Sequence, residues 1–392
     1  MTTTASPPLT AEQFDALGRE LDAVLVSASR TSSDANGHTT TPTARRPLTP
    51  EQFEALGREF DAVRERVTAD LGERDADYIR RILKAQRGLE ISGRGLLFFS
   101  LLPPAWLAGT TALTLSKILE NLEIGHNVLH GQYDFMNDPA VNSVDFEWDS
   151  VCPADQWRHQ HNYMHHTYTN IVGKDRDIGY GILRMFEEQD WHPYYLGNPA
   201  YAVWLALFFE WGAAFHDIEL APALVRKSSL RGKGEAVRGV VSKIGRQALK
   251  DYVLFPLLAG PSAPTTLAAN VTANTTRNVW TFLHIMCAHF PEDTLAFTEE
   301  ECEGESRGEW YYRQMVSSAN TTWGPLGHIL GGNLGFQIEH HLFPDLPAHR
   351  YAEIGVEVEE ICERYELPYI TGPMSRQFAG VVKKLFRLAL PG

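Results

Sequence analysis

The residues best suited to chemistry in this chain are histidines, which gather at three places. They are His126 and His130, then His161, His165 and His166, and finally His340 and His341, preceded by Gln337. Side chains four residues apart share one face of a helix, so each group can direct two ring nitrogens at one point in space. Neutral imidazole binds zinc, copper, iron and nickel. The spacing therefore predicts a metal centre.

The number of candidate ligands indicates more than one ion. A four-coordinate structural zinc would leave about half of these side chains without a role, so two metal ions explain them most simply. Isolated histidines such as His38, His192 and His349 are better explained as ordinary surface or core residues, because a lone histidine is seldom a ligand.

Long apolar segments interrupt an otherwise polar and acidic chain, whose formal net charge is -14. Residues 95–116, 191–209 and 252–276 contain no Asp, Glu, Lys or Arg, and each is long enough to compare with a membrane span of about 18 residues or more. Pro103-Pro104 and the prolines of residues 260–264 would break a helix. We therefore interpret the first and last segments as helical hairpins that turn at these prolines.

The lengths of the second helices predict where the histidines lie. At the α-helical rise, the 22 residues from Pro104 to His126 cover roughly 33 Å and the 25 from Pro264 to His289 roughly 38 Å. Both would cross a bilayer, so His126 and His289 should emerge on the same side. Residues 199–215 include Glu210 and lead into His216. We expect them to lie along the membrane interface or to pack on the layer that holds the metal site, rather than to span.

Basic residues give the expected orientation. Lysines and arginines cluster before each hairpin, at residues 80–94 and 226–250, and positively charged loops stay in the cytoplasm. The basic segments lack the interleaved aromatic residues of a nucleic-acid site, so we expect no nucleic-acid partner. The expected fold is an all-α integral cell-membrane protein. Two transmembrane helical hairpins would be capped by a cytoplasmic helical layer that holds the metal site.

The N-terminal part divides the chain into two regions. A segment beginning at Pro8 recurs at Pro47, and each copy carries a Thr-x-x-Gln capping box, Thr10 with Gln13 and Thr49 with Gln52. We expect residues 1–46 to be a disordered extension and residues 47–392 to be the folded domain. Cys152, Cys287, Cys302 and Cys362 form no CxxC pair, which predicts that this chain carries no iron–sulfur cluster.

The three histidine groups, in their sequence context, resemble those of a known family. The segments GHNVLHGQYDFMNDP, WRHQHNYMHHTYTN and GNLGFQIEHHLFPDLPAHRY are similar to the three histidine boxes of the membrane fatty acid desaturases, in particular to actinobacterial acyl desaturases with a QxxHH third box. The resemblance extends from about Pro47 to Pro373.

The resemblance implies a non-haem centre of two iron ions. With O2 and two electrons, such a centre removes two hydrogens from adjacent methylenes of a long-chain acyl group and leaves a cis double bond. Its implied ligands are His126, His130, His161, His165, His166, His340 and His341, with His289 in the motif CAHFP. Gln337 stands where relatives have a further histidine, and an amide is a weaker ligand. His284, five residues before His289, lies about 140° around the helix and is left out.

Nearby carboxylates are candidates to orient the ligand imidazoles by accepting their second N–H. They are Glu123, Asp134, Asp138, Asp177 and Glu339. The substrate could be an acyl-CoA, an acyl-lipid or an acyl carrier protein, drawn from the membrane lipid or its surface. No fused haem-binding donor domain is recognisable, so a separate ferredoxin or NAD(P)H-dependent reductase is expected. The position of the double bond stays open, with a mid-chain position favoured.

Two other functions are compatible with the residues alone. The same two-iron site could hydroxylate an acyl or alkyl chain, as related membrane hydroxylases do. Alternatively, the histidines could belong to a non-enzymatic membrane protein that binds or transports metal. Transport requires ligands at bilayer depth, whereas these histidines lie outside the apolar segments, which favours an enzyme.

Overall fold

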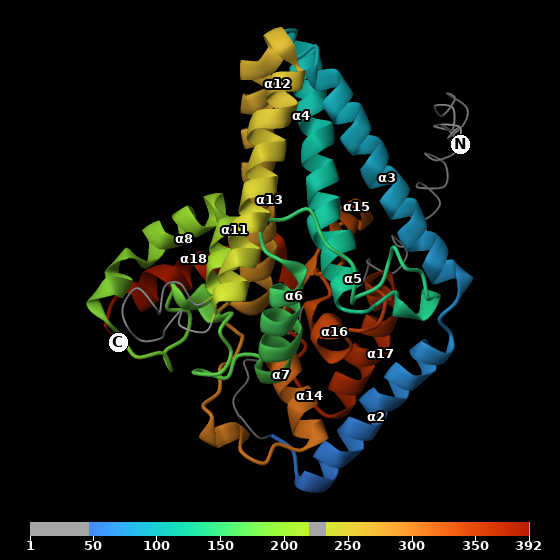
Figure 1. The fold of residues 1–392 in the computed structure, drawn as a ribbon. Coiled ribbons are helices and arrows are strands. Elements are labelled where there is room, and N and C mark those ends of the chain that lie inside the picture. Colours follow the sequence, from blue (N-terminus) through green and yellow to red (C-terminus); the bar gives the residue numbers. More distant parts are fainter. Residues whose placement is uncertain (1–46, 219–232, 392) are drawn as a thin grey trace.

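The computed structural model describes residues 47–218 and 233–391, and this part of the chain is mostly helical (Figure 1). Two short strands, β1 (Asn320–Thr322) and β2 (Thr371–Pro373), pair in parallel with Asn320 opposite Thr371. The predicted helical class is thus confirmed. The predicted extension, residues 1–46, lies outside the described residues, as does the first copy of the repeat with Thr10 and Gln13.

The second copy of the repeat forms the first described helix, α2 (Pro50–Ala69), with the predicted capping box of Thr49 and Gln52. Its apolar face packs against α14 (Arg307–Val316) and α17 (Tyr351–Arg364). The contact is close, because a Cβ on Gly308 would lie 1.8 Å from the carbonyl oxygen of Phe53. This core also includes residues of α16 (Gln337–Leu342), which carries the third histidine group.

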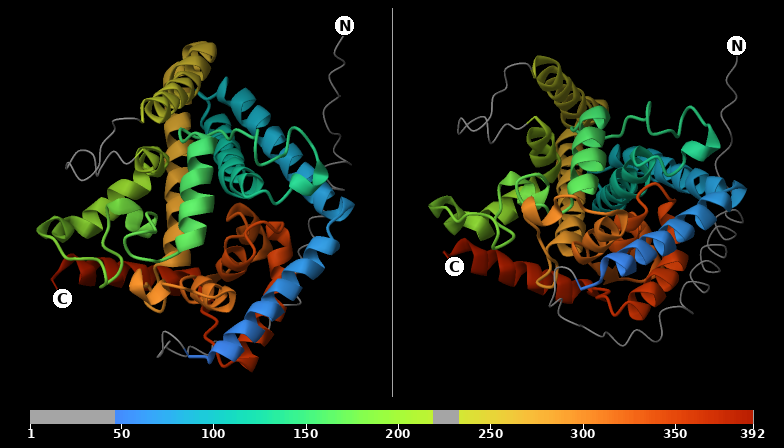
Figure 2. Two further views of the ribbon diagram at one scale, coloured as in Figure 1. Left: turned by 60° about the horizontal axis from the view of Figure 1, so that its bottom comes forward. Right: turned by 90° about the horizontal axis from the view of Figure 1, so that it is seen from below.

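The first long helix pair consists of α3 (Glu73–Leu97) and α4 (Pro103–Ile118), which lie side by side in Figures 1 and 2. Their backbones approach closely at Gly93, where a Cβ would lie 2.9 Å from the amide nitrogen of Leu113. The chain continues from α4 into the π-helix η1 (Leu119–His126) and then α5 (Asn127–Leu129). The pair therefore ends at the first histidine group.

The second helix pair packs beside the first. It runs through α11 (Gly234–Ala248), η6 (Leu249–Leu254), α12 (Phe255–Leu258), η7 (Gly260–Ser262) and α13 (Ala263–His289). Buried Asp251 joins the two pairs, because its carboxylate accepts hydrogen bonds from Arg94 at 3.0 Å and Lys117 at 2.7 Å. The amide of Asn270 on α13 donates to the Asp251 carbonyl. A polar network thus fixes the pairs to one another.

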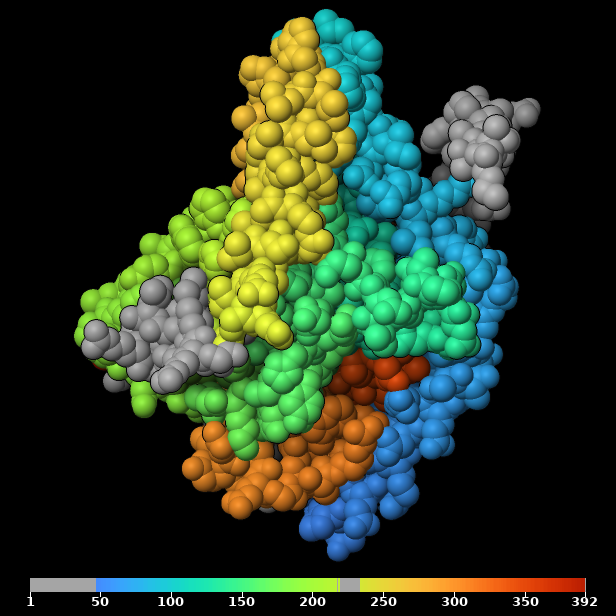
Figure 3. Space-filling view, viewed as in Figure 1, coloured from blue at the N-terminus to red at the C-terminus, as the bar shows by residue number. Residues whose placement is uncertain are grey.

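Across residues 47–218 and 233–391, none of the helices is both long enough and apolar enough to span a membrane. The prediction that both hairpins are transmembrane is therefore not confirmed. Polar side chains such as Asn270, Asn274 and Arg277 lie within α13 and lower its hydropathy. The far ends of both pairs nevertheless project from the molecule (Figure 3). Exposed apolar side chains there include Phe98, Phe99, Leu101, Leu102, Leu107, Leu257 and Leu258.

Residues 199–215 form two short helices, α8 (Asn198–Leu207) and α9 (Phe209–Asp217), which meet at Phe208. Each is roughly 15 Å long at the α-helical rise, in agreement with the predicted non-spanning arrangement. Helix α9 contacts η4 (Ile178–Gly181), and α8 packs with α18 (Met374–Ala389).

The remaining described helices are short. They are η2 (Asp134–Met136), α6 (Ala154–Trp157), η3 (Arg158–His165), α7 (His166–Tyr168), η5 (Pro193–Gly197), η8 (Glu300–Cys302), α15 (Pro325–Leu330) and η9 (Ala348–Arg350). Two of them, η3 and α7, carry the second histidine group.

Candidate metal centre

The histidines of all three sequence groups meet in one buried place, together with His289. His126 ends η1 and His130 follows α5, the second group lies on η3 and α7, His289 ends α13, and the third group lies on α16. Segments more than 200 residues apart in the sequence therefore supply one cluster. His126 and His289 emerge beside the second group, where the hairpin lengths predicted them.

The local helix type differs from the prediction. His161 and His165 lie in the π-helix η3 rather than in a regular α-helix, and His166 begins α7 directly after it. A π-helix is wider, with hydrogen bonds from i to i+5, and short π segments often occur at functional sites. The ring of His161 is consequently as close to that of His166, at 5.0 Å between centroids, as to that of His165, at 5.1 Å. The wider turn lets all three rings face the cluster.

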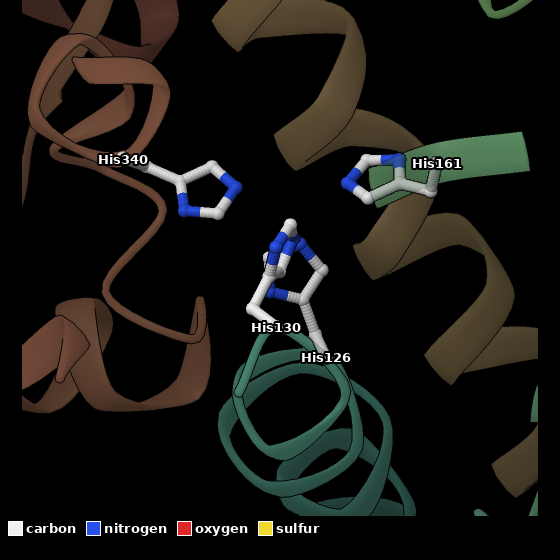
Figure 4. Close-up of side chains that lie close together, drawn as sticks. All are labelled: His126, His130, His161 and His340. Atoms are coloured by element: carbon white, nitrogen blue, oxygen red, sulfur yellow. The ribbon is translucent and has the colours of Figure 1, made fainter. Parts of the chain in front are cut away.

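Four imidazoles form the first part of the cluster, which we call the His126 group: His126, His130, His161 and His340. One ring nitrogen of each lies within 4.8 Å of one from every other member. Figure 4 shows the rings directed toward one another, with His126 and His130 on one helix and His161 and His340 approaching from either side. This convergence can hold one metal ion.

The second part, which we call the His165 group, consists of His165, His289 and His341, under the same 4.8 Å limit. The Nε2 atoms of His289 and His341 are 3.3 Å apart, and the side-chain nitrogen of Gln337 lies 3.0 Å from His289 Nε2. Gln337 thus adjoins this group.

The His166 ring lies between the two groups, with its centroid 4.7 Å from that of His130 and 4.3 Å from that of His341. Both of its ring nitrogens are buried, and neither has a hydrogen-bond partner among the described residues.

Hydrogen bonds fix the orientation of several rings through their Nδ1 atoms. His161 donates to Asp177 at 3.2 Å, His341 to the side-chain oxygen of Gln314 at 2.9 Å and His340 to the hydroxyl oxygen of Tyr351 at 3.3 Å. His126 and His165 donate in the same way to Asn127 and Asp175. Since these oxygens are acceptors, the Nδ1 atoms carry the protons and Nε2 is free to bind a metal.

The opposite ring nitrogens provide a test of whether metal ions fit. The Nε2 atoms of His130, His161 and His340 are buried and make no hydrogen bond within the described part of the chain. Each buried polar atom without a partner costs about 1–3 kcal/mol, and several lie together here. Metal coordination would satisfy them, so the donor set of the His126 group fits a metal ion.

The protonation states agree with metal binding. Burial, together with the neighbouring imidazoles, lowers the pKa values of His130, His166, His340 and His341 well below the ordinary value. These rings are therefore neutral, which is the form that binds metal. Burial opposes ionisation of Asp177, but hydrogen bonds from His161 and His216 outweigh it and hold the pKa of Asp177 well below its usual range.

A cavity of about 80 Å³ adjoins both groups. His126 and His161 line it from the His126 group, and His165 and His289 line it from the His165 group. Its other walls are mainly apolar or aromatic and include Leu122, Trp148, Trp157, Tyr180, Phe209, Ile285, Phe290 and Leu334. An apolar molecule in this cavity would lie beside the imidazole cluster.

Comparison with known proteins identifies the family. The family model described as fatty acid desaturase matches residues 102–373, which include every histidine of the cluster. The chain belongs to the fatty acid desaturase family. It is therefore an enzyme of acyl desaturation, and the function predicted from the sequence is confirmed, whereas a non-enzymatic metal carrier is excluded.

Curated relatives of this desaturase cover most of its length. The NADPH-dependent stearoyl-CoA 9-desaturase of Mycobacterium tuberculosis is 46% identical over 84% of this chain and 78% of its own. The sn-1 linoleoyl-lipid 6-desaturase of Synechocystis is 28% identical over 71% of this chain and 79% of its own. An acyl-lipid (8-3)-desaturase of Mortierella alpina is 24% identical over 55% and 49%. No solved structure matches.

Of the five carboxylates predicted to orient ligand imidazoles in this desaturase, only Asp177 is placed to do so. Glu123 instead accepts hydrogen bonds from Tyr78 and Asn333, and Glu339 accepts from Asn320 and Tyr369. Both point away from the cluster into networks between helices. Among the described residues, no hydrogen bond joins either carboxylate to a ligand imidazole, and their orienting role stays a prediction.

The other two predicted carboxylates stabilise a turn. Asp134 accepts hydrogen bonds from the backbone and hydroxyl of Ser143, and Asp138 accepts one from the backbone of Ala140. Both residues follow the first histidine group after the chain has already left the cluster, so they reach a surface loop. Their role as orienting residues also stays a prediction.

Several orienting residues of the desaturase were missed in the sequence. They are Asn127, Asp175, Gln314 and Tyr351. Asp175 follows the second histidine group by a short loop, and this proximity was an available signal. Gln314 and Tyr351 lie on α14 and α17, and nothing in their local sequence marks them. His284, excluded by helix geometry, bonds the carbonyl of Trp280 and belongs to neither histidine group.

Proposed function

We propose that this desaturase introduces a cis double bond near the middle of a saturated long-chain acyl-CoA. The support is the 46% identity to a relative named an NADPH-dependent stearoyl-CoA 9-desaturase. O2 would be reduced to two waters by two hydrogens from the acyl chain together with two electrons and two protons from outside. We assign the electrons to a separate NADPH-dependent donor protein.

The observation that carries this proposal is the double imidazole cluster beside an apolar cavity. We assign one iron to the His126 group and a second to the His165 group, with Gln337 as a weak neighbour. His166 stands within reach of both. Two iron ions bound there would supply oxidation of unactivated C–H bonds by O2, which no side chain can perform. The protein residues hold the ions, orient the rings and keep water from the reacting carbons.

The substrate chain would occupy the cavity lined by Trp148, Trp157 and Phe209. These aromatic side chains provide flat apolar surface, which suits methylene groups. Because the cavity adjoins ligands of both groups, methylene groups of an acyl chain within it would lie beside the cluster. The mid-chain position of the double bond rests on the similarity to the stearoyl-CoA 9-desaturase.

We also propose that the desaturase is an integral membrane protein with its metal centre on the cytoplasmic side. The exposed apolar side chains at the projecting ends of the helix pairs, such as Phe99, Leu102 and Leu257, support insertion into lipid, because soluble proteins seldom expose such patches. The lysines and arginines of residues 80–94 and 226–250, which come before the apolar part of each helix pair, support the orientation. Fractionation of cells with an alkaline carbonate wash tests this: release into the wash would exclude integral insertion.

The function is tested by expressing the full chain with a matched reductase and feeding deuterated stearate. Mass spectrometry of the fatty acids should show labelled monounsaturated product in cells with the wild-type chain and none with His165→Ala. Chemical cleavage at the double bond then gives its position. Labelled alcohol in place of alkene would establish a hydroxylase, and product from His165→Ala equal to that of wild type would exclude the assigned site.

A further inference from the structure

One carboxylate beside the cluster binds two histidines at once. Asp177 accepts a hydrogen bond from Nδ1 of the candidate ligand His161 at 3.2 Å on one oxygen, and from Nε2 of His216 at 3.1 Å on the other. The side chains of Asp177 and His216 are only 10% and 9% exposed. His216 lies on α9, outside the three histidine groups. Asp177 therefore links His216, which belongs to none of the three histidine groups, to His161 of the second group.

The neighbouring carboxylate Asp175 shows why His216 matters to Asp177. Asp175 orients His165, and its own position is fixed by its loop, since it accepts hydrogen bonds from the backbone N–H groups of Asn170 at 2.8 Å and of Asp177 at 2.9 Å. The side-chain oxygens of Asp177 instead bond two imidazoles. The position of the Asp177 oxygen that faces away from His161 thus depends on the hydrogen bond from His216, which lies on a distant helix.

His216 is itself held in place by the loop that carries Asp177. Arg176 donates to the backbone carbonyl of His216 at 3.3 Å, and the ring of Tyr180 meets the His216 ring edge-on at 5.5 Å. Tyr180 lies between two glycines in a run of left-handed residues, with φ of 57°, 54° and 66° for Gly179, Tyr180 and Gly181. Such a backbone is costly for tyrosine and persists only where its surroundings fix it. Here it turns Tyr180 toward α9.

We propose that His216 is a positioning residue for the His126 group: it fixes the Asp177 carboxylate, which in turn fixes the orientation of the His161 ring. This inference rests on the proposed assignment of an iron ion to that group. Without the donor at His216, a buried oxygen of Asp177 loses its partner. Asp177 then turns toward another donor or toward water, and His161 loses the acceptor that aims its Nε2.

The test compares His216→Phe with His216→Gln in the purified full-length protein. Phenylalanine keeps a ring against Tyr180 but cannot donate to Asp177, whereas glutamine supplies an amide N–H. Ferrous iron is titrated into each protein, and bound iron per chain is measured together with the binding curve. We expect two irons per wild-type chain. In His216→Phe, the affinity of the His126 group for iron should be about 10- to 100-fold weaker. At an iron concentration that just fills both groups of the wild type, His216→Phe should therefore bind about one iron per chain. His216→Gln should recover most of the lost affinity.

The control is His192→Ala, because His192 bonds the backbone of Tyr194 away from the cluster, and it should bind iron as the wild type does. Unchanged affinity in His216→Phe, or an equal loss in His216→Gln, would overturn the positioning role. Wild-type protein that binds no iron would instead overturn the proposed iron centre, and this inference with it. Circular dichroism of each variant establishes that it is folded, and if His216→Phe is not, His216→Leu replaces it in the comparison.

Discussion

Nδ1 of His165 lies 3.1 and 3.0 Å from the two oxygens of Asp175. Both residues are buried, so this contact is shielded from water. Burial alone would lower the pKa of His165, but Asp175 and Asp177 outweigh it and raise that pKa. The same contact directs the opposite ring nitrogen toward the His165 group. Orientation by a carboxylate is thus provided separately to each group, by Asp175 for His165 and by Asp177 for His161.

Replacing Asp175 by asparagine should weaken iron binding at the His165 group by about 10- to 100-fold. Each Asp175 oxygen already accepts a hydrogen bond from a backbone N–H, so the amide keeps one acceptor but places its NH2 group against a backbone donor at the other position. Titration of ferrous iron into purified Asp175→Asn measures the effect. Asp134→Asn is the matched control, because Asp134 only holds the Ser143 turn. An equal loss of iron in both variants would contradict the assignment.

His289 and His284 lie on the same helix but differ in their relation to the cluster. His289→Ala should lose the iron of the His165 group, since His289 Nε2 faces His341. His284→Ala should keep two irons, because His284 belongs to neither group and its Nδ1 donates to the Trp280 carbonyl. Iron analysis of both variants after purification at saturating iron measures the difference. Loss of one iron in His284→Ala would show that the helix geometry has been misinterpreted.

The contact between α2 and α14 depends on Gly308. A Cβ at this position would meet the Phe53 carbonyl oxygen at 1.8 Å, and backbone cannot move as a flexible side chain can. Gly308→Ala should therefore destabilise the protein by about 1–3 kcal/mol. Gly88→Ala, in the middle of α3 with open space around it, should instead stabilise it by up to about 1 kcal/mol. Thermal unfolding in detergent compares the two, and equal melting temperatures would disprove the close contact.

The burial of Lys384 should make the stability of the folded protein depend on pH. This buried lysine on α18 donates to the carbonyl of Pro291 at 3.0 Å and lies 4.1 Å from the ring centre of Phe186. Burial lowers the pKa of Lys384 to about 7, whereas in the unfolded chain it is about 10.4. Between these values the unfolded chain binds the extra proton, so this residue should make stability rise with pH, by at most about 1.4 kcal/mol per unit.

The measurement for Lys384 is chemical unfolding of wild type and Lys384→Met at pH 7, 8 and 9. The difference in unfolding free energy between the two proteins should change across this range, with wild type gaining relative to the variant. A constant difference would show that Lys384 is charged in the folded protein.

The sequence predicted much of the site because metal ligands are restricted in type and spacing. His126 with His130, and His340 with His341, could be grouped from their positions alone. His289 could be added because its CAHFP motif resembles a ligand position of the family, and the expected helix length placed it on the same side as His126. The π-helix at His161 to His166 could not be predicted, since its extra residue per turn depends on the packing around η3.

The orienting residues show the limit of local sequence. Glu339 directly precedes the ligand His340 and Glu123 is three residues before His126, yet their side chains bond Tyr369 and Tyr78. Gln314 and His216 reach the cluster region from α14 and α9. Which polar side chain meets an imidazole depends on how helices far apart in sequence cross, and helical spacing contains no information about this.

The sequence by itself determined the chemistry of this protein: a dense set of imidazoles, carried on helices between apolar segments, in a pattern that only a metal centre explains. The tertiary structure decided how those imidazoles divide into a His126 group and a His165 group, and which residues aim them. The physical reason is that ligand type and spacing along one helix are local properties. The directions of the His161, His165, His340 and His341 rings are instead set by the hydrogen bonds that their Nδ1 atoms donate to Asp177, Asp175, Tyr351 and Gln314. These acceptors come into place only when the helices pack.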